Sequence, residues 1–162
     1  MAENSSSSEH LLWPAAVVEV PSDVLIQVMN VINRYAYIMD NGNVRLLTEV
    51  FTEDALIDTH PSGLHPGQPV SGIDKIIPYL GDHFKLSRVR RHVPTNFYVT
   101  EYSPDRVRVR CYLHCTNSMP TENSASVELT LAGEYDMLLI MNDTGYWRIR
   151  ERITYLDRLN PE

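Results

Sequence analysis

The stretch Leu129-Thr-Leu-Ala-Gly-Glu-Tyr-Asp-Met137 alternates in polarity along most of its length, which is the pattern of a β-strand with one buried face. Tyr135 and the apolar residues at period two share one face, while Glu134 and Asp136 point away from it unless a β-bulge reverses the faces. The same period of two runs through four segments that turn residues separate: 93–101, 107–116, 126–141 and 146–155. The second half of the chain therefore predicts an antiparallel meander.

The first half has helical periodicity instead. Apolar residues recur at helical spacing from Val24 to Met39. Ser22 or Asp23 can cap this helix, and Asn41-Gly42-Asn43 ends it. A short helix, a strand, a proline-containing loop of the kind that often forms a lid, and a third helix then follow at 44–51, 55–59, 61–72 and 73–85. Helices followed by an antiparallel meander predict the α+β class rather than a parallel sheet.

Length and composition indicate one domain around one hydrophobic core, because 43% of the 162 residues are hydrophobic. Residues 1–21, which include the run Ser5–Ser8, are expected to form a flexible arm, and residues 22–158 the domain. The formal charge of −7 argues against nucleic acid or an anionic membrane as a partner. We expect a small-molecule substrate and a homo-oligomer, most simply a homodimer.

The cysteines and the N-terminal region bear on the compartment. Cys111 and Cys115 lie four residues apart on a predicted strand, a separation of about 13 Å that is far beyond disulfide reach. The apolar stretch 11–20 is interrupted by Pro14 and lacks both the basic leader of a signal peptide and the length of a membrane span. A reducing, cytoplasmic location is therefore expected.

Two distant residues suggest acid–base chemistry. Asp40 ends the first predicted helix, and His92 opens a predicted strand. A carboxylate that orients and charges an imidazole builds a proton shuttle without metal or cofactor. Taken alone, Asp40 could equally cap the turn that follows it or face water, and His92 could be an ordinary residue at a strand boundary.

The chain resembles the SnoaL-like group of the nuclear-transport-factor-2-like superfamily over residues 23–156, and its layout is most similar to that of scytalone dehydratase. The residues that carry the resemblance are Tyr35-x4-Asp40, Leu47-x3-Phe51-Thr-Glu-Asp54-Ala55, Gly72-x3-Ile76, Arg91-His92, Gly133-x-Tyr135, Gly145, Trp147, Ile149 and Ile153. The resemblance implies a single-domain α+β cone, in which N-terminal helices wrap a curved antiparallel sheet around an apolar cavity. The group includes dehydratases, cyclases, isomerases, epoxide-opening enzymes and noncatalytic members, so the fold alone does not name a reaction.

By resemblance to the dehydratase, Asp40 and His92 form a hydrogen-bonded catalytic pair, and Tyr35 lines the pocket beside them. The chain also departs from the dehydratase pattern. The two tyrosines that polarise the substrate carbonyl in that enzyme correspond to Met39 and Thr59 here. Its second catalytic histidine falls on or beside Cys111, so scytalone itself is not expected to be the substrate.

Other side chains are candidates for the pocket wall. Asn96 shares a strand face with His92 at period two and could donate a hydrogen bond to substrate, although a turn or edge role is the simpler interpretation. Tyr135 lies on the apolar face of its strand, and Tyr79 of the third helix could place a phenol at the cavity mouth or simply pack in the core. No metal site is predicted from Cys111-Tyr-Leu-His114-Cys115, because on a strand His114 faces away from both cysteines.

The sequence thus predicts a cofactor-independent cyclase, dehydratase or isomerase that acts on an apolar oxygenated metabolite, such as a polyketide or prenylated aromatic compound. We expect His92 to begin as a neutral base and Asp40 to stabilise the imidazolium that forms. The proposed catalytic residues are Asp40, His92, Tyr35 and Tyr79, and the proposed substrate-binding residues are Met39, Thr59, Asn96, Cys111 and Tyr135. The alternatives are an epoxide-opening cyclase or hydrolase, and a noncatalytic binding or oligomerisation module.

Overall fold

The computed structural model describes residues 18–60, 69–84, 89–120 and 125–157, of which 83–84, 89, 117–120 and 125–130 are described by their backbone only. The helices are α1 (Ser22–Asn41), the 3₁₀ helix η2 (Val44–Glu49) and α2 (Ile73–Phe84). The strands are β1 (Phe51–His60), β2 (Val70–Ser71), β3 (Val89–Ser103), β4 (Arg106–Pro120), β5 (Ala125–Met141) and β6 (Trp147–Leu156). The α+β class is confirmed.

The described strands form one sheet in the order β2-β1-β6-β5-β4-β3. Strands β3 to β6 follow one another as the predicted antiparallel meander, and β2 also pairs antiparallel with β1. One pair departs from the predicted antiparallel arrangement, because β1 runs parallel to β6. This pairing is possible because β1 and β6 are not joined by a hairpin: a helix and four strands lie between them in the chain.

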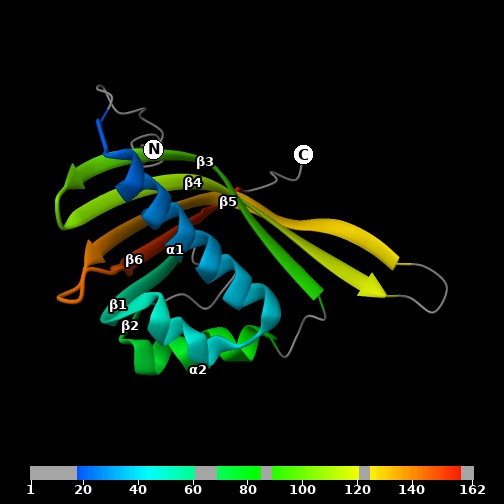
Figure 1. Cartoon of the computed structure of the whole chain (residues 1–162). Helices are drawn as coiled ribbons and strands as arrows, with labels where there is room; N and C mark the ends of the chain where they lie inside the picture. Colours follow the sequence, from blue (N-terminus) through cyan, green and yellow to red (C-terminus); the bar gives the residue numbers. More distant parts are fainter. Residues whose placement is uncertain (1–17, 61–68, 85–88, 121–124, 158–162) are drawn as a thin grey trace, which may run out of the picture.

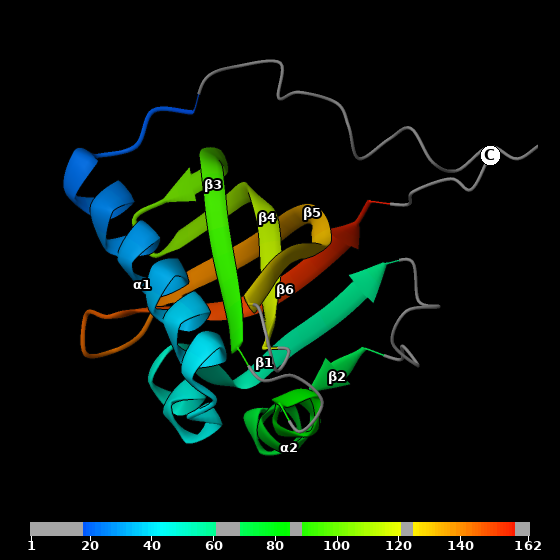
Figure 2. The same ribbon diagram turned by 90° about the vertical axis from the view of Figure 1, so that its right-hand side faces the viewer.

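The α-helices α1 and α2 both lie on one side of the curved sheet (Figures 1 and 2). Figures 1 and 2 show α1 crossing the concave face of the sheet, with α2 beside β1 and β2 at one end. The core fills the space between α1 and the sheet, and its largest fully buried side chains include Trp147, Tyr35, Ile32 and Ile149. The cavity described below is bordered by Met39 near the end of α1 and by His92, which Asp40 contacts.

The helix boundaries agree closely with the periodicity. Gly42 ends α1 in the left-handed conformation (φ 71°), and its N–H donates to the Ile38 carbonyl. Pro78 lies inside α2 beyond the first turn, where it removes one intrahelical hydrogen bond. The predicted lid loop 61–72 falls largely outside the described residues, as do residues 1–17 of the predicted arm.

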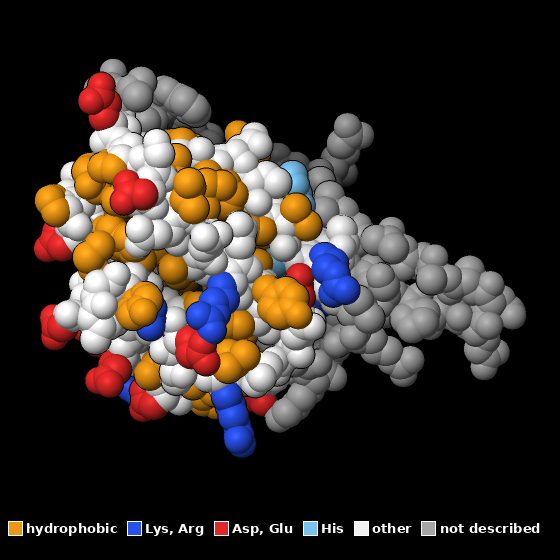
Figure 3. Space-filling model, viewed as in Figure 1, with side chains coloured by type: hydrophobic (Ala, Val, Ile, Leu, Met, Phe, Trp, Pro, Cys, Tyr) orange, Lys and Arg blue, Asp and Glu red, His pale blue; other side chains and the backbone are white. Residues whose placement is uncertain are grey.

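The surface over α1 mixes apolar and charged side chains (Figure 3). Ile26 and Tyr37 on this helix are well exposed. None of the described helices is long and apolar enough to cross a membrane. The homo-oligomer and the cytoplasmic location stay predictions.

Candidate active site

Asp40 and His92 meet, although 52 residues separate them in the chain. The Oδ1 atom of Asp40 lies 2.8 Å from His92 Nδ1, and it also accepts a hydrogen bond of 2.8 Å from the His92 backbone N–H. Each side chain is only 10% exposed. The predicted contact is therefore confirmed. With Nδ1 held by the carboxylate, Nε2 is the ring nitrogen that can exchange a proton with a group in front of it.

The position of β3 explains this arrangement. It is the last strand of the described sheet, so the N–H groups on its outer edge have no neighbouring strand. Asp40 at the end of α1 accepts the hydrogen bond from one of them, that of His92. The same carboxylate thereby fixes both the backbone and the ring of the residue.

The surroundings of His92 favour its charged form. Burial alone would lower its pKa, but the hydrogen bonds to Asp40 and Cys115 and the negative charge that Tyr35 and Cys115 can carry raise the pKa from 6.5 to about 9. At neutral pH only about 1% of such an imidazole is neutral. This favours an imidazolium that acts first as an acid over the neutral base expected from the sequence.

His92 borders a cavity of about 260 Å³. Six of the candidate residues line it, and Asp40 lies behind His92. The lining residues are Tyr35, Met39, Thr59, Tyr79, Leu80, Arg90, His92, Leu113, Cys115, Leu131, Tyr135, Arg152, Thr154 and Leu156. Most of this wall is apolar or aromatic, which suits a small organic ligand with few polar groups.

Two predicted substrate-binding residues do not line the cavity. Asn96 is exposed and sits where the register of β3 against β4 shifts, with a positive φ of 56°, so the period-two argument that placed it beside His92 fails at this bulge. Cys111 is fully buried in the core, and burial raises the pKa of its thiol to about 12. Cys115, four residues further along the same face of β4, takes the place expected for Cys111.

Arg152 is the main cavity residue that the sequence pattern missed. Trp147 and Ile149 at the start of β6 face the core, so strict alternation would turn Arg152 outward. A register shift between β5 and β6 leaves Arg150 as the extra residue and reverses the faces beyond it. The reversal makes Arg152 buried and places it on the cavity wall.

Arg152 lies among aromatic groups. Its Nη1 donates to the Tyr35 hydroxyl oxygen, and its Cζ lies 5.7 and 5.8 Å from the ring centroids of Tyr35 and Tyr135. In the described part of the chain no carboxylate pairs with this guanidinium, and its Nε has no partner. Burial opposes the charge, but contacts with the two tyrosines keep the pKa of Arg152 above its usual value, so it remains a cation.

Tyr135, one of the two tyrosines beside Arg152, is a neutral phenol at ordinary pH. Burial raises the pKa of Tyr135 well above 10, and the negative charge that Tyr35 can carry adds to this. The rings meet edge to face with centroids 6.1 Å apart. The Tyr35 oxygen accepts from Arg152, which leaves the phenol proton for donation to a neighbouring oxygen.

The predicted orientation of the side chains in segment 111–115 is confirmed. His114 is exposed on the face of β4 opposite the two buried cysteines, and both cysteines are free thiols. Among the described residues, no three His, Cys, Asp or Glu side chains come together in a way that could hold a metal ion. The cavity therefore contains a proton-transfer pair, a buried cation and phenols, all supplied by the chain itself.

The curved sheet with helices on its concave face has the fold of solved structures that are described as NTF2-like or cystatin-like, and this defines a fold class. Within that class, the chain belongs to the SnoaL-like domain family, whose model matches residues 25–153. No curated protein sequence matches the chain.

Solved structures agree on the fold. The chain is similar to Rv3472 from Mycobacterium tuberculosis, a protein of unknown function, with 24% identity over 85% of this chain and 74% of that one and a TM-score of 0.71. It is similar to a protein from Novosphingobium aromaticivorans named a presumptive scytalone dehydratase (18% identity, 84% and 85% covered, TM-score 0.69). A protein from the same organism described as NTF2-like with a cystatin-like fold gives 15% identity, 86% and 84% covered, and a TM-score of 0.66. At these identities the likeness establishes the fold.

Proposed function

We propose that this protein is a cofactor-independent acid–base enzyme that dehydrates, cyclises or isomerises an apolar oxygenated small molecule, such as a polyketide or prenylated aromatic compound. The observation that carries the proposal is the Asp40–His92 pair at the wall of a mainly apolar cavity. A buried carboxylate–imidazole pair that borders a cavity of ligand size is well placed to move a substrate proton.

The charge state of His92 suggests the order of events. The imidazolium donates the Nε2 proton to a leaving hydroxyl, and the carbon–oxygen bond breaks as water leaves. The neutral ring then takes a proton from the adjacent carbon, which forms the double bond and restores the imidazolium. Asp40 holds the ring in place and stabilises its charged form throughout.

Arg152 and the phenols complement this step. Among the described residues this guanidinium has no carboxylate partner and donates to Tyr35. It can also donate to a substrate carbonyl oxygen, which makes the adjacent C–H bond more acidic. Tyr79 and Tyr135 also line the cavity and can position hydroxyl or carbonyl oxygens. Met39, Leu113 and Leu131 supply apolar surface for the rest of the molecule.

The test is a screen of hydroxyketones, open-chain polyketide mimics and matched epoxy alcohols, followed by variants on the first compound that turns over. His92→Ala should lower kcat/KM by about 10²- to 10⁴-fold. Asp40→Asn should also lower kcat/KM, because it removes the negative charge beside the ring. The fold should be kept, since the amide oxygen can still accept the hydrogen bond from the His92 backbone N–H. His114→Ala is the matched control, since this histidine is exposed on the opposite face of the sheet.

Near-normal turnover in both site variants, with folding confirmed by circular dichroism, would refute the proposal. If only the epoxy alcohols are turned over, the proposed reaction changes from loss of water to opening of an epoxide. Epoxide opening also begins with proton donation by an acid. Tight binding of screened compounds without any turnover would support a noncatalytic binding module instead.

A further inference from the structure

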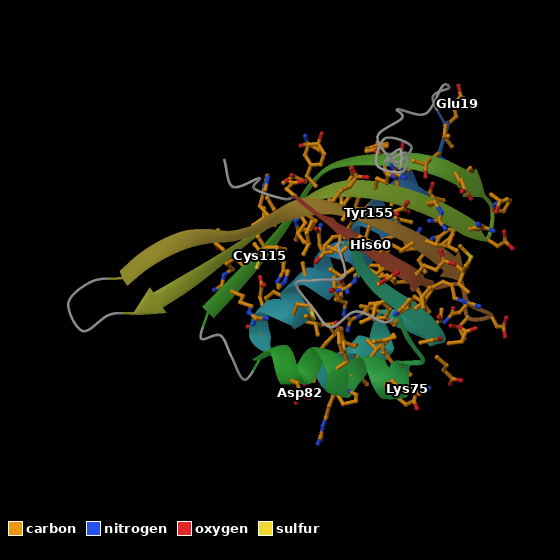
Figure 4. All side chains as sticks on the ribbon, turned by 180° about the vertical axis from the view of Figure 1, so that it is seen from behind. Glu19, His60, Lys75, Asp82, Cys115 and Tyr155 are labelled. Carbon is orange, nitrogen blue, oxygen red and sulfur yellow. The ribbon has the colours of Figure 1, made fainter. Side chains whose placement is uncertain are left out.

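Cys115 occupies a position that the proposed reaction does not use. It lies directly opposite His92 in the β3–β4 register and lines the same cavity. Figure 4 shows it on β4 near the point where the long strands leave the helix-covered body. Only 6% of its surface is exposed, so reagents reach it through the cavity rather than from the outer surface.

The pairing of His92 and Cys115 brings their side chains close. The His92 N–H donates to Asp40 and not to β4, so the two residues form a pair without backbone hydrogen bonds between them. In antiparallel sheets the side chains of such pairs approach most closely. A hydrogen bond joins the thiol and the imidazole, and Asp40, His92 and Cys115 therefore form a continuous series.

Such a series is the arrangement that activates sulfur. A thiol is nucleophilic as the thiolate, and an adjacent imidazolium is one of the groups that stabilise a thiolate in proteins. An imidazole that is oriented by a third group, and that can take up the thiol proton once it has given up its own, completes the pattern of an activated nucleophile. Cys111 lacks all of these features, because it does not line the cavity and has no such contact with His92.

A second observation points to the ligand. Arg152 is 6% exposed and lines the same cavity, and among the described residues its Nε has no hydrogen-bond partner. Within the described chain its charge is not neutralised by a carboxylate, although its Nη1 donates to Tyr35. A buried cation of this kind favours a ligand that carries, or acquires during reaction, negative charge on oxygen.

We propose that Cys115 is a nucleophile that adds reversibly to α,β-unsaturated carbonyl compounds bound in the cavity, with the Arg152–Tyr35 pair stabilising the enolate oxygen. This activity goes beyond proton transfer to a substrate. Through this activity the protein would bind α,β-unsaturated carbonyl compounds covalently and reversibly in the cavity.

The step balances without any further reactant. A bond forms between Cys115 Sγ and the β-carbon, while the electron pair of the carbon–carbon π bond moves toward the carbonyl oxygen to give the enolate. The imidazolium of His92 donates its Nε2 proton to the α-carbon, and the Cys115 thiol proton replaces it on the ring. The ketone is thereby restored, and His92 ends in its starting form. Nothing is oxidised or reduced, and the reverse path releases the free thiol and the alkene.

The experiment treats the full-length protein with 4-phenylbut-3-en-2-one and follows the intact mass, with peptide mapping of the adduct. The saturated analogue 4-phenylbutan-2-one is the matched ligand that cannot form an adduct. We expect one adduct, on Cys115, formed about tenfold or more faster than with glutathione at pH 7, because the cavity holds the enone beside Sγ and Arg152 stabilises the enolate oxygen. The saturated ketone should slow adduct formation, because it competes with the enone for the cavity.

Two variants assign the adduct. Cys111→Ser should react as the unmodified protein does, and Cys115→Ser should give no adduct. Arg152→Gln should slow the reaction several-fold without changing the site. A rate no higher than that of glutathione, or equal labelling of Cys111 in the folded protein, would overturn the proposal. Since the readout is mass and not turnover, this result is independent of whether the proposed acid–base reaction is found.

Discussion

A single carboxylate oxygen, Asp40 Oδ1, contacts both the backbone N–H and the ring Nδ1 of His92, each at 2.8 Å. The first contact fixes the start of an edge strand to the end of α1, and the second fixes the charge and orientation of the ring. One residue thus combines a structural role with an electrostatic one. Variants that separate the two roles are the most informative.

The pH dependence of kcat/KM should report the charge of His92. If the imidazolium donates the first proton, activity is constant at neutral pH and falls as the pH rises through about 9. Asp40→Asn removes the stabilising charge and leaves the burial that lowers the pKa, so the fall should move to lower pH by about one to three units. Activity that instead rises through pH 9 would restore the neutral-base mechanism.

The same ionisation should affect folding. The pKa of His92 is raised from 6.5 to about 9 on folding, so its stabilising contribution is fully present below pH 6.5 and is lost as the pH rises to about 9. The full contribution is at most about 3 kcal/mol, at 1.36 kcal/mol per pKa unit. Urea unfolding at pH 6 and pH 9.5 measures it. His92→Gln should show a correspondingly smaller loss between these pH values, and equal losses in both proteins would contradict the assignment.

Gly133 on β5 is required by close approach of the next strand. A Cβ built there would lie 2.1 Å from the Tyr155 backbone oxygen, which cannot move without disturbing β6. We expect Gly133→Ala to lower the free energy of unfolding by about 2 kcal/mol or more. Gly81→Ala is the matched control: its Cβ would meet only Val44 at 3.6 Å, and alanine in a helix should add up to about 1 kcal/mol. Denaturant midpoints distinguish the two effects.

Periodicity predicted the helices, the meander and the inward face of β5 because regular elements repeat the same geometry at each residue. The contact between Asp40 and His92 was expected from family resemblance, since no local pattern joins residues so far apart. The errors fall at bulges: one at Asn96 and one at Arg150 each change which face the following residues occupy. Alternation along a strand also predicts which side of the sheet a residue faces, but not whether it lies in the packed core or at the cavity. It therefore could not distinguish Cys111 in the core from Cys115 at the cavity.

Arg152 should show a conflict between stability and activity. It is a buried cation without a carboxylate partner among the described residues, and such groups oppose folding through their desolvation cost. Arg152→Met keeps most of the volume and removes the charge, so we expect it to raise the free energy of unfolding by about 1 kcal/mol while turnover falls. Arg152→Lys keeps a cation but loses the planar contact with the two tyrosine rings, and it should recover only part of the activity. Denaturant unfolding and kcat/KM of the three proteins test this, and a methionine variant that is both less stable and fully active would contradict it.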